Sequence, residues 1–189
     1  MGLLESLVNV PERLRIWHLS GVRYLLLPEA GQGTGPEESA VPDPSAWPDP
    51  WPGFLAKTPR QARLCIAYAA LGFDLTGRAD HRRSALWRRL IADLGLGGHG
   101  LVAFWPPALP EGDALVPQPA IFRAGLSLLT PNVLAFFGDP ASCALPLDAA
   151  DVPFPAVGGI PCVLLPDPET LLAGDQEVWD HVLSLLGHV

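Results

Sequence analysis

The sequence predicts an α/β fold, a three-layer sandwich built around a central, mostly parallel sheet. The first observation is the order of segments from residue 63 onwards, where short apolar runs alternate with stretches of helical periodicity. The second is that these apolar runs have almost no polar residue inside them, as in strands that are covered on both faces. Such alternation is typical of a parallel sheet with helices on both sides.

Composition supports one well-packed domain over residues 1–189. Hydrophobic residues make up 49% of the chain and charged residues 17%, which argues against global disorder. The net charge of −8 makes the whole molecule a poor general ligand for a nucleic-acid backbone. Three isolated cysteines and no signal peptide favour a reducing, cytoplasmic setting, and no apolar run has the length of a membrane span.

Sequence templates for cofactors and metals are missing. There is no Gly-x-Gly-x-x-Gly fingerprint, no phosphate-binding loop and no Gly-x-Ser-x-Gly elbow. The histidines and cysteines have no spacing typical of metal ligands. We therefore expect neither a cofactor nor a metal.

The first third of the chain differs from the rest. Residues 1–27 predict an N-terminal helix and a strand, and residues 28–59 predict an irregular strap rich in proline and tryptophan. We expect Trp47, Trp51 and Phe54 to pack back onto the domain, because large aromatic side chains mainly bury area. The alternative is a polyproline-II ligand for another protein.

Residues 63–186 predict the α/β core. A helix from Arg82 to Leu94 is expected to begin after the N-cap Asp80 and to end at Gly95. The other expected elements are strands at 64–72, 101–105, 132–138 and 160–165, loops at 73–77 and 106–119, and helices at 120–129 and 171–186.

Two turns follow the last two strands of this series. Gly138-Asp139 comes after one apolar run, and Pro166-Asp167-Pro168-Glu169 comes after the next. Ligands of open α/β sheets bind beyond the carboxyl ends of the strands. We therefore expect these two turns to border any site.

Four segments carry a resemblance to a known superfamily. They are Gly72-Phe73-Asp74, Phe104-Trp105-Pro106-Pro107, Ala135 to Ala141, and Leu164-Leu165-Pro166-Asp167-Pro168-Glu169. In order and in their terminal glycines and prolines, they resemble the motifs of the uracil-DNA glycosylase superfamily over residues 63–186. The resemblance implies a glycosylase-like fold with a site at the strand ends.

The departures from that superfamily concern its catalytic residues. Asp74 matches the carboxylate of the first motif, but Leu75 stands where the superfamily has proline. Asp167 stands where the superfamily has the histidine that stabilises the uracil anion, and a carboxylate would repel that charge. The asparagine that contacts uracil has no counterpart beside Phe104. We therefore expect no excision of uracil and a site that is lost or remade.

Two functions remain open from the sequence. One is a non-catalytic, glycosylase-like scaffold that acts through protein or nucleic-acid contacts. The psi subunit of the bacterial DNA polymerase III clamp loader, which the segment from Trp17 to Val22 resembles in outline, acts by holding proteins. The alternative is a hydrolase of altered chemistry that uses Asp74, Asp139 or Asp167. Convergence of these carboxylates on a pocket would favour the enzyme, whereas aromatic side chains filling that space would exclude it.

The candidate contact surface is a basic helix. Residues 56–100 carry eight lysines and arginines against three acidic residues, within an acidic chain. An acidic peptide or a few phosphates are the ligands that such a surface would bind weakly; the alternative is a solvated helix face. The candidate binding residues are Arg78, Arg82, Arg83, Arg88 and Arg89.

Overall fold

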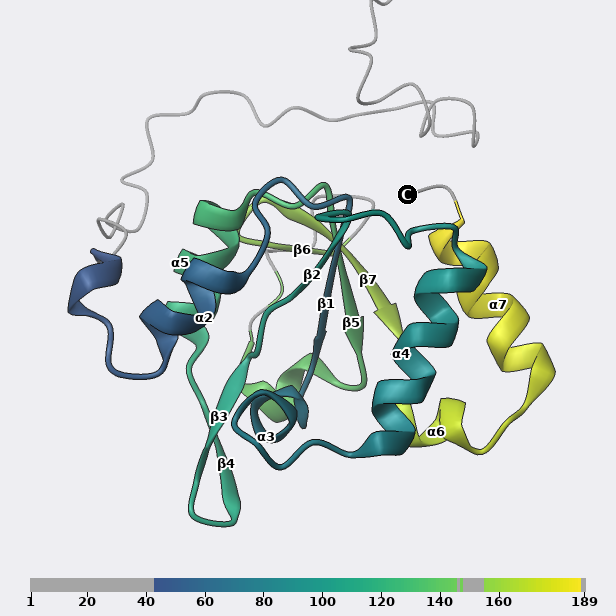
Figure 1. Ribbon diagram of the computed structural model, residues 1–189, viewed down its shortest axis with the longest axis horizontal. Helices are drawn as coiled ribbons and strands as arrows, with labels where there is room; N and C mark the ends of the chain where they lie inside the picture. The colour runs from purple at the N-terminus through teal and green to yellow at the C-terminus, as the bar shows by residue number, and fades with distance from the viewer. Residues whose placement is uncertain (1–42, 146, 148–154, 188–189) are drawn as a thin grey trace, which may run out of the picture. The chain divides into compact units, whose positions relative to one another are not determined.

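The computed structural model describes residues 43–145, 147 and 155–187 (Figure 1). The helix and strand predicted within residues 1–27 lie outside the described residues. The same holds for residues 28–42 of the predicted strap.

The centre of the fold is a five-stranded sheet with the strand order β2-β1-β5-β7-β6. The four strands from β2 to β7 are parallel, and the two-residue β6 is antiparallel to β7. The prediction of an α/β fold with a mostly parallel sheet is therefore confirmed. The strands are β1 (Leu64–Tyr68), β2 (Val102–Phe104), β5 (Val133–Phe137), β6 (Ala156–Val157) and β7 (Ile160–Leu165).

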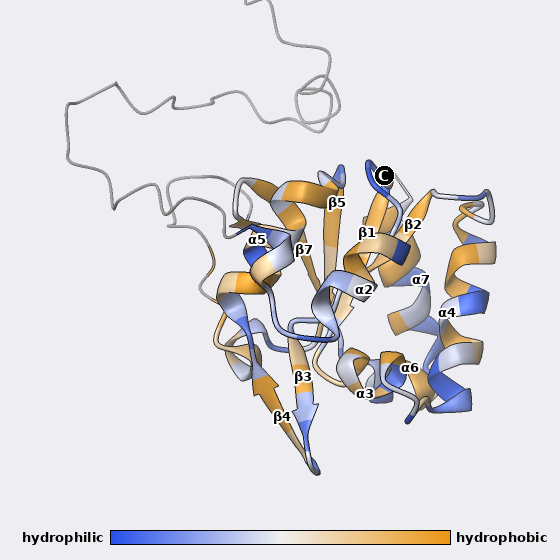
Figure 2. Ribbon diagram, turned by 60° about the vertical axis from the view of Figure 1, so that its left-hand side comes forward, coloured by the Kyte–Doolittle hydropathy of each residue, from blue (hydrophilic) through white to orange (hydrophobic). Residues whose placement is uncertain are grey.

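Each face of the sheet has its own hydrophobic core, because successive side chains of a strand point to opposite faces. In β1, Cys65 and Ala67 belong to one core, whereas Leu64, Ile66 and Tyr68 belong to the other. The helices α2 (Trp51–Lys57) and α5 (Pro119–Leu129) pack in the first core. The helices α4 (His81–Asp93) and α7 (Gln176–Leu186) pack in the second. In Figure 2 the strands are mainly hydrophobic, whereas α4 has one hydrophobic and one hydrophilic side.

The predicted basic helix forms close to its expected position. It spans His81–Asp93, and the Asp80 carboxylate accepts a hydrogen bond of 2.7 Å from the Arg82 backbone N–H. Leu86, Trp87 and Leu90 are its buried residues, which matches the predicted apolar spacing. The helix therefore follows from local signals in the sequence.

The proline-rich strap is more regular than predicted. Residues Pro44–Ala46 form the 3-10 helix η2, and Trp51–Lys57 form α2, so the prediction of no regular element is wrong there. Proline is tolerated in the first turn of a helix, where its missing N–H would have no intrahelical partner. Trp47 and Trp51 are buried against Trp105, with ring centroids 6.3 and 5.3 Å apart, so these two side chains of the strap pack onto the domain as expected.

Two predicted loops also contain regular structure. The strand predicted at 64–72 is β1, which ends at Tyr68 rather than at Gly72. The short helix α3 (Leu71–Leu75) replaces much of the loop that was expected at 73–77. Residues 106–119 contain an antiparallel hairpin of β3 (Ala108–Glu111) and β4 (Ala114–Pro117). The hairpin turns at the dipeptide Gly112-Asp113, a strong turn signal that the proline content obscured.

The last predicted helix is divided in two. The helix α6 (Pro168–Leu172) ends before Gly174, and α7 begins after a new N-cap, Asp175. Asp175 accepts a hydrogen bond of 2.9 Å from the Glu177 backbone N–H. An aspartate directly after a glycine marks this break in the sequence.

The sheet topology places a switch point next to β1. The chain runs from β1 to β2 on one side of it, and then to β5 on its other side. In open α/β sheets, ligands bind at the carboxyl ends of the strands where the connections diverge in this way. Within the described part of the chain, no helix combines the length and the apolar character needed to cross a lipid bilayer.

Candidate functional site

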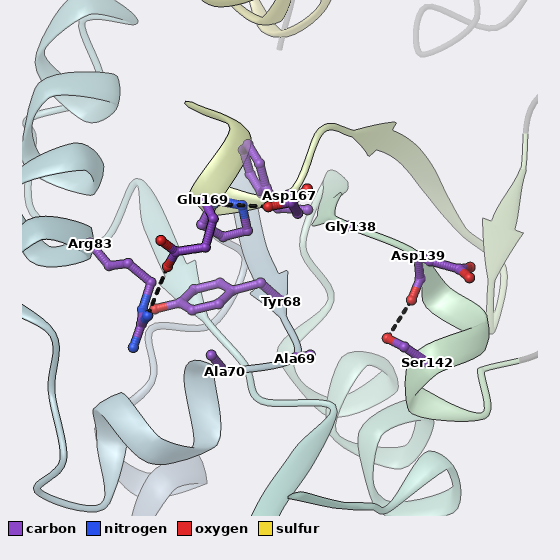
Figure 3. A pocket seen from close by; sticks show the side chains of 11 residues that line it. Tyr68, Ala69, Ala70, Arg83, Gly138, Asp139, Ser142, Asp167 and Glu169 are labelled. Carbon is purple, nitrogen blue, oxygen red and sulfur yellow. Dashed lines mark hydrogen bonds and ion pairs between the residues drawn. The ribbon is translucent and has the colours of Figure 1, made fainter. Parts of the chain in front are cut away.

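A pocket of about 260 Å³ lies at the carboxyl ends of β1, β5 and β7 (Figure 3). Its walls come from Tyr68–Ala70 after β1, from Gly138-Asp139 after β5, and from Asp167–Glu169 after β7. The two turns that the sequence singled out therefore border the same pocket. They meet because parallel strands end at one edge of the sheet.

Asp167 lines the pocket, and its carboxylate caps α6. Its Oδ1 accepts hydrogen bonds from the backbone N–H groups of Glu169 (2.9 Å) and Thr170 (3.0 Å), and its Oδ2 accepts one from the Thr170 hydroxyl (2.7 Å). The Thr170 side chain and these backbone donors lower the pKa of Asp167 below its ordinary value. Asp167 is thus ionised at neutral pH and is not a proton donor.

Asp139 plays a similar role in the turn after β5. Its carboxylate accepts a hydrogen bond of 2.9 Å from the Ala141 backbone N–H, at the start of the 3-10 helix η3 (Pro140–Cys143). Its backbone oxygen accepts a hydrogen bond of 2.6 Å from the Ser142 hydroxyl. Capping thus explains the aspartates that follow both β5 and β7.

Asp74 does not line this pocket. Arg83 binds its carboxylate at two points, with Nε 2.9 Å from Oδ2 and Nη2 2.8 Å from Oδ1. The Tyr68 hydroxyl donates to Oδ2 (2.7 Å), and the Asp80 backbone N–H donates to Oδ1 (3.0 Å). Burial by itself would raise the pKa of Asp74, but these donors and the charge of Arg83 outweigh it and lower the pKa. These four hydrogen bonds tie α3 to β1 and to the start of α4.

The enzyme hypothesis requires the carboxylates of Asp74, Asp139 and Asp167 to converge on one pocket, and only two of the three do so. Asp139 and Asp167 line one pocket together with Glu169, whereas Asp74 lies outside it. Aromatic side chains do not fill the space, although Tyr68 and Phe137 form part of its wall. Of the carboxylates that do converge, Asp139 and Asp167 are hydrogen-bonded as caps, and Glu169 pairs with Arg82 and Arg83.

Among the described residues that line the pocket, Arg83 is the only cation, and acidic side chains surround it. Besides Asp74, its Nη1 lies 3.2 Å from Glu169 Oε1 and 3.5 Å from Asp80 Oδ2. The pocket thus combines a compensated arginine with three carboxylates, those of Asp139, Asp167 and Glu169. Such a wall repels an anion that develops during a reaction.

A chain of hydrogen bonds runs from Trp87 through Tyr68 to Asp74, the carboxylate that binds Arg83. The sequence did not predict this chain. Trp87 Nε1 donates to the Tyr68 hydroxyl (3.0 Å), which in turn donates to Asp74. Burial and the neighbouring Asp74 raise the pKa of Tyr68, so it remains a neutral donor. The one available signal was a tyrosine at the end of an otherwise apolar strand.

The other arginines of the predicted basic surface also have partners. Arg78 contacts Asp113 (3.1 Å), Arg82 contacts Asp80 (3.0 Å) and Glu169 (3.6 Å), and Arg89 contacts Asp93 (3.5 Å). Arg89 also lies over the ring of Trp179, 4.2 Å from its centroid. Arg88 donates to the Ser84 backbone oxygen (3.2 Å). Carboxylates thus pair with Arg78, Arg82, Arg83 and Arg89, whereas Arg88 contacts a backbone oxygen.

The segments that resemble glycosylase motifs serve different purposes in the fold. Gly72 lies so close to the backbone of Ala108 that a side chain would overlap with the Ala108 carbonyl. Trp105 is fully buried, and its Nε1 donates to the Phe122 backbone oxygen (3.1 Å). Both residues have packing roles, and neither lines the pocket.

Cys65 and Cys162 supply no reactive thiol, and the described residues form no metal-binding cluster. Burial raises the pKa of Cys65 and that of Cys162 to about 12, so both thiols stay protonated at neutral pH. Among the described residues, no group of three or more histidine, cysteine, aspartate or glutamate side chains is arranged to hold a metal ion.

Comparison with known proteins adds no relative to these observations. Neither the scan against protein-family models nor the search of curated proteins finds a match to this chain.

Proposed function

We propose that this chain is a non-catalytic, glycosylase-like three-layer sandwich that acts by holding a partner protein. The observation that carries the proposal is the binding of Asp74 by Arg83, Tyr68 and the Asp80 backbone. Asp74 is the carboxylate that the resemblance assigns to water activation. A carboxylate with both oxygens engaged by strong donors is a poor base and cannot orient water.

The glycosylase-like part of the proposal has support from the position of the pocket. The last two segments that carry the resemblance end in the turns that line it. The superfamily's anion-stabilising histidine is replaced by Asp167, which caps a helix. In this proposal the pocket lies where the superfamily has its active site, but it lacks the histidine that would stabilise a developing anion.

A protein partner fits better than a nucleic acid. Nucleic acids bind to lysines and arginines that exchange counterions for phosphates. Here Arg82 and Arg89 already contact carboxylates, and the whole chain has a net charge of −8. The binding of a protein partner does not require lysines and arginines that are free of carboxylate partners.

An excision assay tests the non-catalytic part. Uracil-containing single- and double-stranded oligonucleotides are incubated with the full chain, and abasic sites are revealed by alkaline cleavage. We expect no cleavage above a buffer control. Turnover by the wild type that disappears in Asp74→Asn would overturn the proposal, whereas turnover that persists in this variant would be traced to a contaminating glycosylase.

The alternative is a hydrolase that uses the strand-end carboxylates. It is favoured by one observation, which is that Asp139, Asp167 and Glu169 share a pocket wall. Nitrophenyl esters, phosphates and glycosides are the substrates to test, with Asp139→Asn and Asp167→Asn as variants. Hydrolysis by the wild type that either variant abolishes would establish the alternative.

A further inference from the structure

A second pocket, of about 270 Å³, lies beside β2 and outside the site described above. The end of α2 contributes Phe54 and the segment Lys57–Pro59, α3 contributes Leu75, and β2 contributes Val102 and Phe104. Leu75 is 38% exposed, so its apolar surface is accessible from the pocket. We call this pocket the β2 groove.

Among the described strands, β2 forms an edge of the sheet, and this edge borders the β2 groove. β2 stands at the end of the strand order and pairs only with β1 among the described strands. The Leu101 backbone oxygen accepts a hydrogen bond from the Leu64 N–H, and the Trp105 N–H donates to the Ile66 backbone oxygen. The backbone N–H and C=O groups of the odd-numbered residues in and beside β2 therefore point toward β1. Backbone groups alternate along a ladder, so those of Val102 and Phe104 point away from β1. In the described part of the chain they have no hydrogen-bond partner.

An open edge lined with apolar side chains is the template for strand addition. An extended segment supplies the missing backbone partners, while alternate side chains enter the neighbouring pocket. The edge is also short, and Pro106-Pro107 follows soon after it. Shortness and proline discourage uncontrolled pairing of edges, so this edge suits a short segment.

The positive charge of Lys57 indicates which kind of segment the β2 groove binds. Of the described residues that line the β2 groove, only Lys57 has an ionisable side chain, and it is exposed. It favours acidic residues in a bound segment. A second copy of this chain, paired edge to edge about a two-fold axis, would bring both Lys57 side chains to one interface, where they repel each other.

We propose that the β2 groove binds an extended acidic segment of a partner protein, which adds a strand to the sheet at Val102 and Phe104. Apolar residues at alternate positions of that segment contact Phe54 and Leu75, and its acidic residues contact Lys57. The inference rests on the proposed function, because it names the surface through which the scaffold holds its partner.

The test uses the full chain and a fluorescein-labelled peptide, Glu-Val-Glu-Val-Glu-Val-Glu, followed by anisotropy. The wild type should bind this peptide more tightly than Lys-Val-Lys-Val-Lys-Val-Lys. Val102→Pro removes an N–H that faces outward, at an edge position where proline is tolerated, and should weaken binding about tenfold. Lys57→Glu should weaken it about two- to fivefold, as expected for an exposed ion pair.

The matched control is Lys57→Arg, which keeps a positive charge at the same position of the β2 groove; it should leave the affinity nearly unchanged. Amide hydrogen exchange of the wild type gives a second measurement that does not depend on a variant's folding. Peptide should slow the exchange of the Val102 and Phe104 amides and leave that of Ala103, which already faces β1, unchanged.

Three results would overturn the inference: no binding of the acidic peptide, equal binding by Val102→Pro with unchanged amides, or preference for the lysine peptide. Dimers of the wild type that Val102→Pro abolishes would identify a second copy as the occupant and would also overturn it. Uracil or ester turnover would defeat the non-catalytic proposal alone, so the two failures are distinguishable.

Discussion

Arg83 binds Asp74 through two parallel hydrogen bonds, of 2.9 Å from Nε and 2.8 Å from Nη2. Both side chains are largely withdrawn from solvent, with 14% and 11% of their surfaces exposed. The pair joins the N-terminal half of α4 to the segment after β1. The ion pair makes Asp74, one of the three candidate catalytic carboxylates, part of the structural framework.

The first prediction concerns this pair. Asp74→Asn should lower the free energy of unfolding by about 1.5–3 kcal/mol at pH 7, because Arg83 loses its charged acceptor. The matched control is Asp113→Asn, whose fully exposed carboxylate pairs with Arg78; solvent screens this pair, so the substitution should change stability far less. Urea unfolding of both variants measures the difference; equal effects would contradict the assigned role.

The same pair predicts a pH dependence. The pKa of Asp74 is lowered in the folded state, so its stabilisation is present above the unfolded-state pKa of about 3.9. It is lost as the pH falls through the folded-state pKa. The stability difference between wild type and Asp74→Asn should therefore be constant from pH 7 to about 5 and shrink below about 4. A difference that grows in acid would have the wrong sign.

The second prediction concerns the contact between Gly125 and Trp105. A side chain on Gly125 would overlap with the indole ring of Trp105. Gly125→Ala should destabilise the fold by about 1–3 kcal/mol, which is typical of overpacking. Gly53→Ala in α2 is the matched control: nothing lies within 4 Å of its new methyl group, and stability should rise by about 0.5–1 kcal/mol. Destabilisation by both variants would point to a general intolerance of alanine.

The third prediction separates capping from catalysis at Asp167. Asp167→Ala should cost about 0.5–2 kcal/mol of stability, because the first N–H groups of α6 lose their acceptor. Asp167→Asn should retain most of that stability, since asparagine is also a good N-cap. Thermal unfolding of the two variants measures this. If alanine and asparagine were equally destabilising, the negative charge itself would be the required feature.

The fourth prediction concerns the basic helix as a nucleic-acid surface. Because Arg82 and Arg89 contact carboxylates, we expect no measurable binding of fluorescent single-stranded DNA by the wild type, even at low salt. The double variant Arg82→Glu/Arg89→Glu should behave in the same way. Binding by the wild type that high salt or the double variant abolishes would restore the arginines as a contact surface.

The amino-acid sequence determined the features that depend on neighbouring residues. Periodicity marked the strands of the sheet and the amphipathic α4, and Asp80 marked its N-cap. The same local signals placed turns after β5 and β7, and the rule for parallel strands brought those turns to one edge. The α3 helix and the β3–β4 hairpin escaped prediction, because short elements carry few residues of pattern.

Only the tertiary structure decided which charges meet. Arg83 reaches Glu169 across 86 residues of chain, and Arg78 reaches Asp113 across 35. No local pattern encodes such contacts, since they depend on where the connections between strands bring each helix. The same is true of the β2 groove, whose walls come from α2, α3 and β2. The sequence shows which charged side chains the chain has. Packing determines which of them form ion pairs within the fold and which stay accessible to a partner.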